Sequence, residues 1–287
     1  MTNLKTLFLF SLLSAILVAI GWVIGGFGGM VVFLVIAAVM NFSSYWFSDK
    51  MVLKTSGAKE VTREEEPRLH SIVEEVANLA MIPKPRVYLI NSDTPNAFAT
   101  GRNAKHAAVA VTTGIMRILD EREMRGVLGH ELGHIRNHDI LVQTVVATVA
   151  GAITMIAWML QWSMIFGGGR RGGRDNPLAL IGLLATIILA PIAATLIRMA
   201  ISRSREFGAD ATGARMVHDP EALASALLKL QAGVQMRPLP QNGVTQATAH
   251  LYIVNPFRSE GMATLFSTHP PIEERVRRLR VMAGLAI

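Results

Sequence analysis

Four long apolar segments constrain the fold of this chain more than any other feature of its sequence. They cover residues 7–23, 29–42, 141–166 and 178–200. A helix needs about 17–25 residues to cross a bilayer, and the second segment reaches that length only by including residues 43–47. Only 17% of the 287 residues are charged, too few to cover a soluble protein of this size. The sequence therefore predicts an integral membrane protein with two helical hairpins. Arg170, Arg171 and Arg174 at the far end of the second hairpin leave two alternatives for it, full crossing or partial shielding.

The first apolar segment has a second interpretation, as a secretory signal. However, it lacks a clear small-residue cleavage site, and the glycine-rich residues 25–30 lead directly into the next segment, which favours an uncleaved hairpin. Lys50, Lys54 and Lys59 follow this hairpin, so the positive-inside rule places its exit in the cytoplasm. The net charge of +7 is explained in the same way, because basic residues commonly flank apolar spans and set their orientation in the membrane. We therefore expect no nucleic-acid partner.

The polar stretches predict a mainly α-helical domain with a small β-sheet. Helices are expected from near Asp120 and over residues 64–79, 220–233 and 271–282. Extended runs are expected over residues 86–90, 96–101 and 107–113. The chain then divides into four parts: an N-terminal hairpin (1–47), a first half-domain (48–139), a second hairpin (140–200) and a second half-domain (201–287). Because each half is short, we expect them to form one domain interrupted by the second hairpin.

Residues 130–134 read His-Glu-Leu-Gly-His. On a helix, His130 and His134 lie one turn apart on one face, so both imidazoles can bind one metal ion. Glu131 lies beside them, where its carboxylate can take a proton from a water that the metal activates. The chain has no cysteine, so any further protein ligand must be a histidine or a carboxylate. The pattern is typical of zinc peptidases.

Two simple choices of a third ligand fail. His138 continues the four-residue spacing, but it lies about 12 Å along the helix from His130, too far to share an ion held at ~2 Å. The longer metzincin motif needs glycine at 137 and histidine at 140, where this chain has Asn137 and Ile140. The remaining solution is a carboxylate from a second helix.

Glu206 and Asp210 supply that carboxylate and a supporting one. They are one helical turn apart, so Glu206 is predicted to bind the metal while Asp210 holds a ligand imidazole. His134 lies seven residues before Leu141, and Glu206 lies seven residues after Met199. If the two apolar segments form an antiparallel hairpin, both ligands lie about 10 Å beyond its base, at matching height. A polar helix end without function is the alternative.

The chain resembles the HtpX-type membrane zinc metalloproteases, which are related to the endopeptidases that process prenylated CAAX proteins. The resemblance covers nearly the whole length and rests on the two hairpins and on residues 96–101, 130–134, 204–210 and 267–271. It implies a gluzincin-like domain with one zinc ion bound by His130, His134 and Glu206, and Glu131 as the catalytic residue. It also implies a multi-pass protein of the bacterial inner membrane, with its catalytic domain in the cytoplasm, that clears misfolded membrane proteins.

Other residues are candidates for substrate binding or transition-state stabilisation. His269 precedes two prolines and is a candidate donor to the oxyanion, with Arg275 as a partner; a turn or cap residue is the alternative. Asn96, Ala97 and Phe98 begin a run that predicts an edge strand able to pair with an extended substrate; a surface loop is the alternative. Recognition through backbone hydrogen bonds gives little sequence preference, so we expect that the protease can also cleave exposed parts of its own chain.

Two other functions use some of the same residues. A site-2-type intramembrane protease also carries His-Glu-x-x-His, but within an apolar span, whereas charged residues lie on both sides of the motif here. A non-catalytic zinc-binding membrane scaffold would have no need of Glu131. Hydrolysis of an unfolded protein, with and without a chelator, separates the scaffold from the enzyme.

Overall fold

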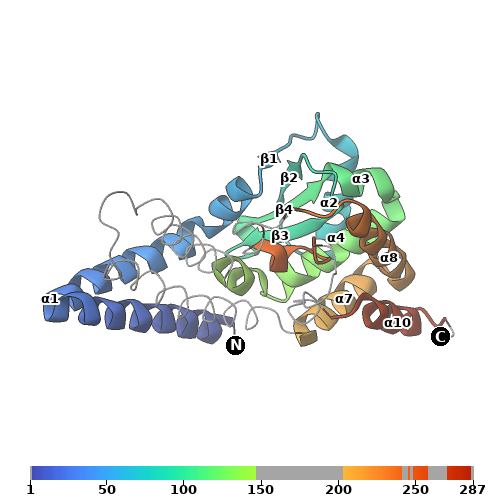
Figure 1. Ribbon diagram of the computed structural model, residues 1–287. Helices are drawn as coiled ribbons and strands as arrows, with labels where there is room; N and C mark the ends of the chain where they lie inside the picture. The colour runs from blue at the N-terminus through green and yellow to red at the C-terminus, as the bar shows by residue number, and fades with distance from the viewer. Residues whose placement is uncertain (1, 147–202, 241–244, 246–247, 258–269, 286–287) are drawn as a thin grey trace, which may run out of the picture.

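The computed structural model describes residues 2–146, 203–240, 245, 248–257 and 270–285. A long helical hairpin projects from a domain in which helices surround a small sheet (Figure 1). The described part is mainly helical with a small mixed sheet, so that prediction is confirmed. The predicted second hairpin lies almost entirely outside the described residues; only its beginning, residues 140–146, is described and is helical.

The first hairpin is α1 (Thr2–Thr55), which bends sharply at Gly25 and Gly26. Gly26 has φ +57° and ψ −141°, a conformation that side-chain-bearing residues avoid. The two arms then lie against each other, since Asn41 Nδ2 donates to Ser14 Oγ across them at 2.8 Å. The glycine-rich run of residues 25–30 thus provides the turn of the hairpin.

The second arm, Gly25–Thr55, is the one helix among the described residues that is long and apolar enough to cross a membrane. Its apolar side chains point outward: Phe27 is 69% exposed and Phe42 is 60% exposed. The core helix of a soluble protein buries such side chains, so this arm has the surface of a helix that faces lipid.

The sheet has four strands in the order β1-β2-β4-β3. They are β1 (Ala58–Glu60), β2 (Arg86–Ile90), β3 (Ala97–Gly101) and β4 (Ala107–Thr112). β2 and β4 are parallel, and the other pairs are antiparallel. The three predicted strands are confirmed, whereas the short β1 is an addition. β3 lies at an edge of the sheet, as residues 96–101 were predicted to do.

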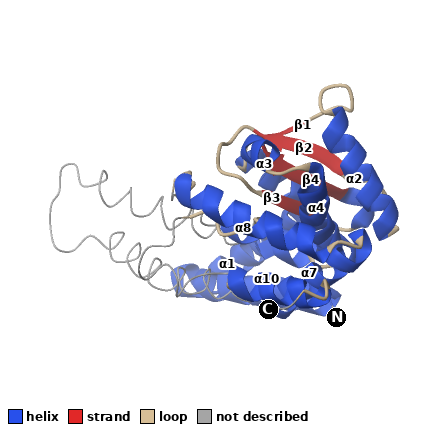
Figure 2. Cartoon of the chain, turned by 90° about the vertical axis from the view of Figure 1, so that its right-hand side faces the viewer, coloured by secondary structure: helices blue, strands red, loops and turns tan. Residues whose placement is uncertain are grey.

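Helices cover both faces of the sheet. On one face, α2 (Pro67–Ala80) and α4 (Glu121–Arg136) pack against residues such as Val109 and Val111 (Figure 2). On the other face, the last turns of α1 contribute Val52 and Leu53 to a core with Phe98 and Tyr252. The end of the hairpin is therefore part of the domain's core.

The remaining described helices are α3 (Thr113–Ile118), α7 (Arg203–Val217), α8 (Pro220–Met236) and α10 (Ile272–Met282). α7 and α8 pack on α4, α10 packs on α8 and α7, and α3 contacts β4. The predicted start of α4 is confirmed, because Asp120 caps it and exchanges hydrogen bonds with Glu123 in a capping box. α4 and α7 pack closely together, and this contact positions the candidate site.

Candidate metal centre

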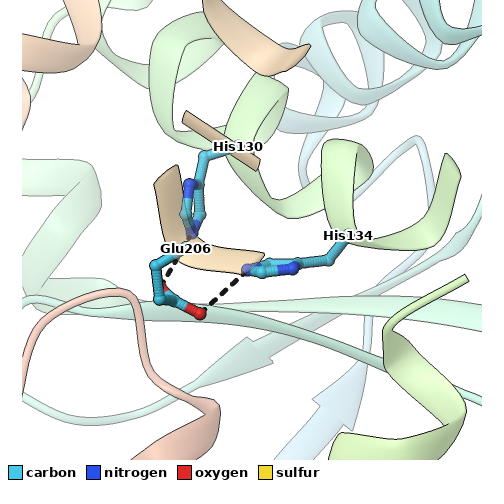
Figure 3. Close-up of side chains that lie close together, drawn as sticks. All are labelled: His130, His134 and Glu206. Carbon is cyan, nitrogen blue, oxygen red and sulfur yellow. Dashed lines mark ion pairs between the residues drawn. The ribbon is translucent and has the colours of Figure 1, made fainter. Parts of the chain in front are cut away.

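α4 and α7 bring together three of the predicted site residues, His130, His134 and Glu206 (Figure 3). The Nε2 atom of His130 lies 3.7 Å from Glu206 Oε2, and Nε2 of His134 lies 3.5 Å from Glu206 Oε1. The two imidazole rings are nearly perpendicular, with centroids 4.7 Å apart. All three side chains are buried. The potential ligand atoms thus converge on one small volume.

This donor set fits a divalent metal ion. Zinc bonds to nitrogen and oxygen are about 2.0–2.2 Å long, so neighbouring ligand atoms of a tetrahedral site lie about 3.4 Å apart. The separations of 3.5 and 3.7 Å approach this value. Two imidazoles and one carboxylate leave the fourth position open, which is the arrangement of catalytic rather than structural zinc sites.

Small residues allow α4 and α7 to approach closely enough to form this site. A Cβ atom on Gly213 would lie only 2.5 Å from the carbonyl carbon of Gly129, and one on Gly133 would lie 3.1 Å from the carbonyl oxygen of Ala209. The glycines are therefore required by close backbone contact. They place Glu206, which is two turns before Gly213, beside the two histidines.

Gly213→Ala should consequently weaken both folding and metal binding. The added methyl group must push α7 away from α4, and overpacking of this kind typically lowers the free energy of unfolding by about 1–3 kcal/mol. Gly208→Ala is the matched control, since Gly208 lies on the same helix and a Cβ there meets nothing within 4 Å. It should leave both properties intact or raise stability slightly. Thermal unfolding in detergent and competition with a chromogenic chelator measure the two effects; equal behaviour of the variants would contradict the packing argument.

Two buried charged residues, Asp210 and Arg275, orient His130 on the side of its Nδ1 atom. Its Nδ1 lies 2.8 Å from Asp210 Oδ1, and Arg275 donates from Nε and Nη2 to the two oxygens of Asp210 at 2.8 and 2.7 Å. Burial acts to raise the pKa of Asp210, but the Arg275 guanidinium outweighs it and holds the pKa at about 2. Burial lowers the pKa of His130 to about 4. The imidazole is therefore neutral, the form that binds metal.

His134 has a corresponding partner, Asp139, which the sequence analysis did not identify. Asp139 Oδ2 lies 3.2 Å from His134 Nδ1. The chain reaches this position because His138 adopts a left-handed conformation (φ +61°) just after α4 ends, and the Asp139 amide donates to the His134 carbonyl. His138 itself is exposed. Burial acts to lower the pKa of His134, but the neighbouring Glu206 and Asp139 carboxylates raise it overall.

Glu131 lies beside the three ligands and against the edge strand. Its Oε2 accepts a hydrogen bond from the Ala99 amide at 2.8 Å, whereas Oε1 is buried and has no hydrogen-bond partner among the described residues. Burial raises the pKa of this carboxyl to about 8. The backbone of β3 thus orients one oxygen and leaves the other available to a water molecule.

The residues predicted to bind substrate are placed differently. Asn96 is buried, and its side chain bonds to the backbone of Val254. The Ala97 carbonyl accepts from the Ile253 amide at 3.1 Å. Phe98 is fully buried and packs edge-to-face on Tyr252, on the sheet face that α1 covers. Arg275, besides its bonds to Asp210, donates from Nη1 to the Ile253 carbonyl. His269 lies outside the described residues.

Comparisons with known proteins agree with this geometry. Residues 63–283 match peptidase family M48. The chain is 53% identical over 285 residues to a protease HtpX homolog of Persephonella marina, and the alignment covers 99% of this chain and 98% of that protein. It is 52% identical to a protease HtpX homolog of Pyrococcus furiosus, and that alignment covers 97% of this chain and 95% of the homolog. The fold resembles the crystal structure of S. mikatae Ste24p, with a TM-score of 0.51 and 17% identity, over 96% of this chain but only 62% of that one.

Proposed function

Because this chain belongs to peptidase family M48 and is an HtpX-type membrane metalloprotease, we propose that it is a zinc-dependent endopeptidase acting on misfolded or damaged membrane proteins. The observation that supports this best is the buried Glu131 carboxylate beside the group of His130, His134 and Glu206. A site that only bound zinc would not need this further buried carboxyl, whose burial without a role is costly.

In the proposed reaction, His130, His134 and Glu206 bind one zinc ion through side-chain nitrogen and oxygen atoms. When bound, zinc acts as a Lewis acid that activates water and polarises the scissile carbonyl. Glu131 accepts the proton of the attacking water at Oε1 and delivers it to the leaving amine. Asp210 and Asp139 each accept a hydrogen bond from an imidazole Nδ1, which leaves Nε2 of both rings, on the side of Glu206, to bind the metal.

The edge strand β3 is the proposed binding surface for the substrate backbone. Ile253 already bonds to Ala97, and the amides of Ala99 and Gly101 donate to Glu131 and Thr144. We therefore place the substrate backbone at the Ala99 carbonyl, directly beside Glu131. Asn96 and Phe98 then act as supports of this strand instead of touching substrate. Recognition through backbone hydrogen bonds depends little on the substrate's side chains. Broad specificity of this kind suits a protease that removes misfolded proteins.

Arg275 is better explained as a positioning residue than as a donor to the oxyanion. Its guanidinium is fully buried and binds Asp210 and the Ile253 carbonyl, so its donors are directed at protein groups. His269 remains our candidate for the oxyanion donor.

We further propose that the protein spans the bacterial inner membrane several times, with its catalytic domain in the cytoplasm, and that it can cleave itself. Lys50, Lys54 and Lys59, after the first hairpin, support this orientation.

Casein digestion by the detergent-purified, full-length protein tests this function. We expect hydrolysis that a chelator abolishes and that zinc restores, with full activity reached at one zinc ion per chain. The scaffold alternative predicts metal binding without hydrolysis under any zinc condition. Loss of activity on chelation without recovery on adding zinc would instead indicate a different metal.

A further inference from the structure

The edge strand β3 lies along the last part of α1, and its direction is fixed at both ends. At its C-terminal end, the guanidinium of Arg102 stacks on the Trp46 ring, 4.6 Å from the centroid. At its N-terminal end, Asn96 and Ser56 line the same cavity of about 230 Å³. Ser56 is ten residues beyond Trp46, about 15 Å along a helix axis. β3 therefore runs antiparallel to α1, with its C-terminal end towards the apolar part of the hairpin (Figure 1).

That C-terminal end is the membrane-proximal end of the strand. Trp46 packs against Tyr45 after the apolar stretch and before Asp49, the first charged residue beyond it, and tryptophan and tyrosine favour this interfacial position. A second apolar segment meets the same place: Thr144, near the start of residues 141–166, accepts a hydrogen bond from the Gly101 amide at 3.3 Å. The other end of the strand, at Ala97, is met instead by Ile253 from the polar part of the chain.

This direction gives a substrate strand a defined polarity relative to the membrane. Antiparallel pairs are slightly more stable than parallel ones and outnumber them two- to three-fold. A chain that pairs antiparallel to β3 runs from the Gly101 end to the Ala97 end. The residues N-terminal to the cleaved bond then leave the site towards the membrane, and those C-terminal to it leave into the polar domain.

We propose that this protease selects polypeptide segments that directly follow a membrane helix, so that the substrate's anchor is N-terminal to the cleaved bond. The proposal rests on the proposed function and on β3 as the substrate-binding edge. Ala99, beside Glu131, is two residues from Gly101, about 7 Å at ~3.3 Å per residue. We therefore expect the first cut within about ten residues of the end of the membrane helix, since an extended chain needs few residues to cover this distance.

Two matched substrates test the polarity. Both carry one apolar helix and one unstructured segment of identical sequence, but the helix precedes the segment in one and follows it in the other. Each is reconstituted with the zinc-loaded protein in phosphatidylethanolamine–phosphatidylglycerol vesicles, and only molecules whose segment lies on the side of the catalytic domain are counted. Cleavage rates and cut positions are measured by mass spectrometry. The same segment without a helix, in solution, is the third substrate.

We expect the substrate with the preceding helix to be cleaved several-fold faster, close to its helix. Both anchored substrates are concentrated equally at the membrane, so a difference between their rates reports the direction of the substrate strand. Equal rates, or faster cleavage of the substrate with the following helix, would overturn the proposed polarity while leaving the protease function intact. If neither anchored substrate, nor the unanchored segment, nor casein is cleaved, the proposed function itself fails, and this result is distinguishable from the first.

Discussion

Glu131→Gln should leave the protein folded and loaded with metal but reduce casein hydrolysis by roughly 10²–10⁴-fold, the usual contribution of a general acid–base group. Glutamine has the same shape and keeps an oxygen that can accept from the Ala99 amide. It cannot take a proton from water. Burial raises the pKa of Glu131 to about 8 in the metal-free protein, so replacing the carboxyl by a neutral amide should not lower stability there.

Two controls isolate the proton-transfer role. Glu121→Gln makes the same chemical change on the same helix, at an exposed residue that pairs with Arg68, and should retain full activity. Glu206→Ala removes a proposed ligand and should lose metal and activity together. Turnover is followed by release of labelled peptides, and metal content by atomic absorption. Normal turnover by the purified Glu131→Gln variant would exclude Glu131 as the general base.

The metal-binding group illustrates what a single sequence can predict. Four-residue spacing on a helix fixes which side chains share a face, so His130 with His134, and Glu206 with Asp210, could be paired before the fold was known. The grouping of Glu206 with the two histidines could be predicted only through the chemistry of the metal and an assumed hairpin. Within the described residues, close packing of glycines explains this contact.

Other features depend on conformation or on distant residues. Asp139 reaches His134 only because His138 takes a left-handed conformation, and no periodic pattern indicates that turn. Asn96 and Phe98 belong to a predictable strand, but their burial depends on residues more than 150 positions later, such as Val254. The use of Arg275 as the partner of Asp210 depends likewise on how α10 packs on α7.

Arg275→Met should be the most destabilising single change at the site. It leaves Asp210 buried without its cation, and breaking a buried ion pair in this way typically costs about 3–5 kcal/mol. It also removes the donor to the Ile253 carbonyl, which connects α10 to the segment that covers β3. His130 then rests on an uncompensated carboxylate, so metal affinity should fall together with stability.

A double variant separates the buried charge from simple loss of packing. Asp210→Asn with Arg275→Met removes both charges, so it should be more stable than Arg275→Met alone, whereas independent packing defects would add. Arg277→Met, an exposed residue on the same helix paired with Glu274, should change little. Thermal unfolding in detergent and chelator competition measure both properties. If Arg275→Met matched the parent in both, the ion pair would have no positioning role, and the guanidinium would again be a candidate to contact substrate.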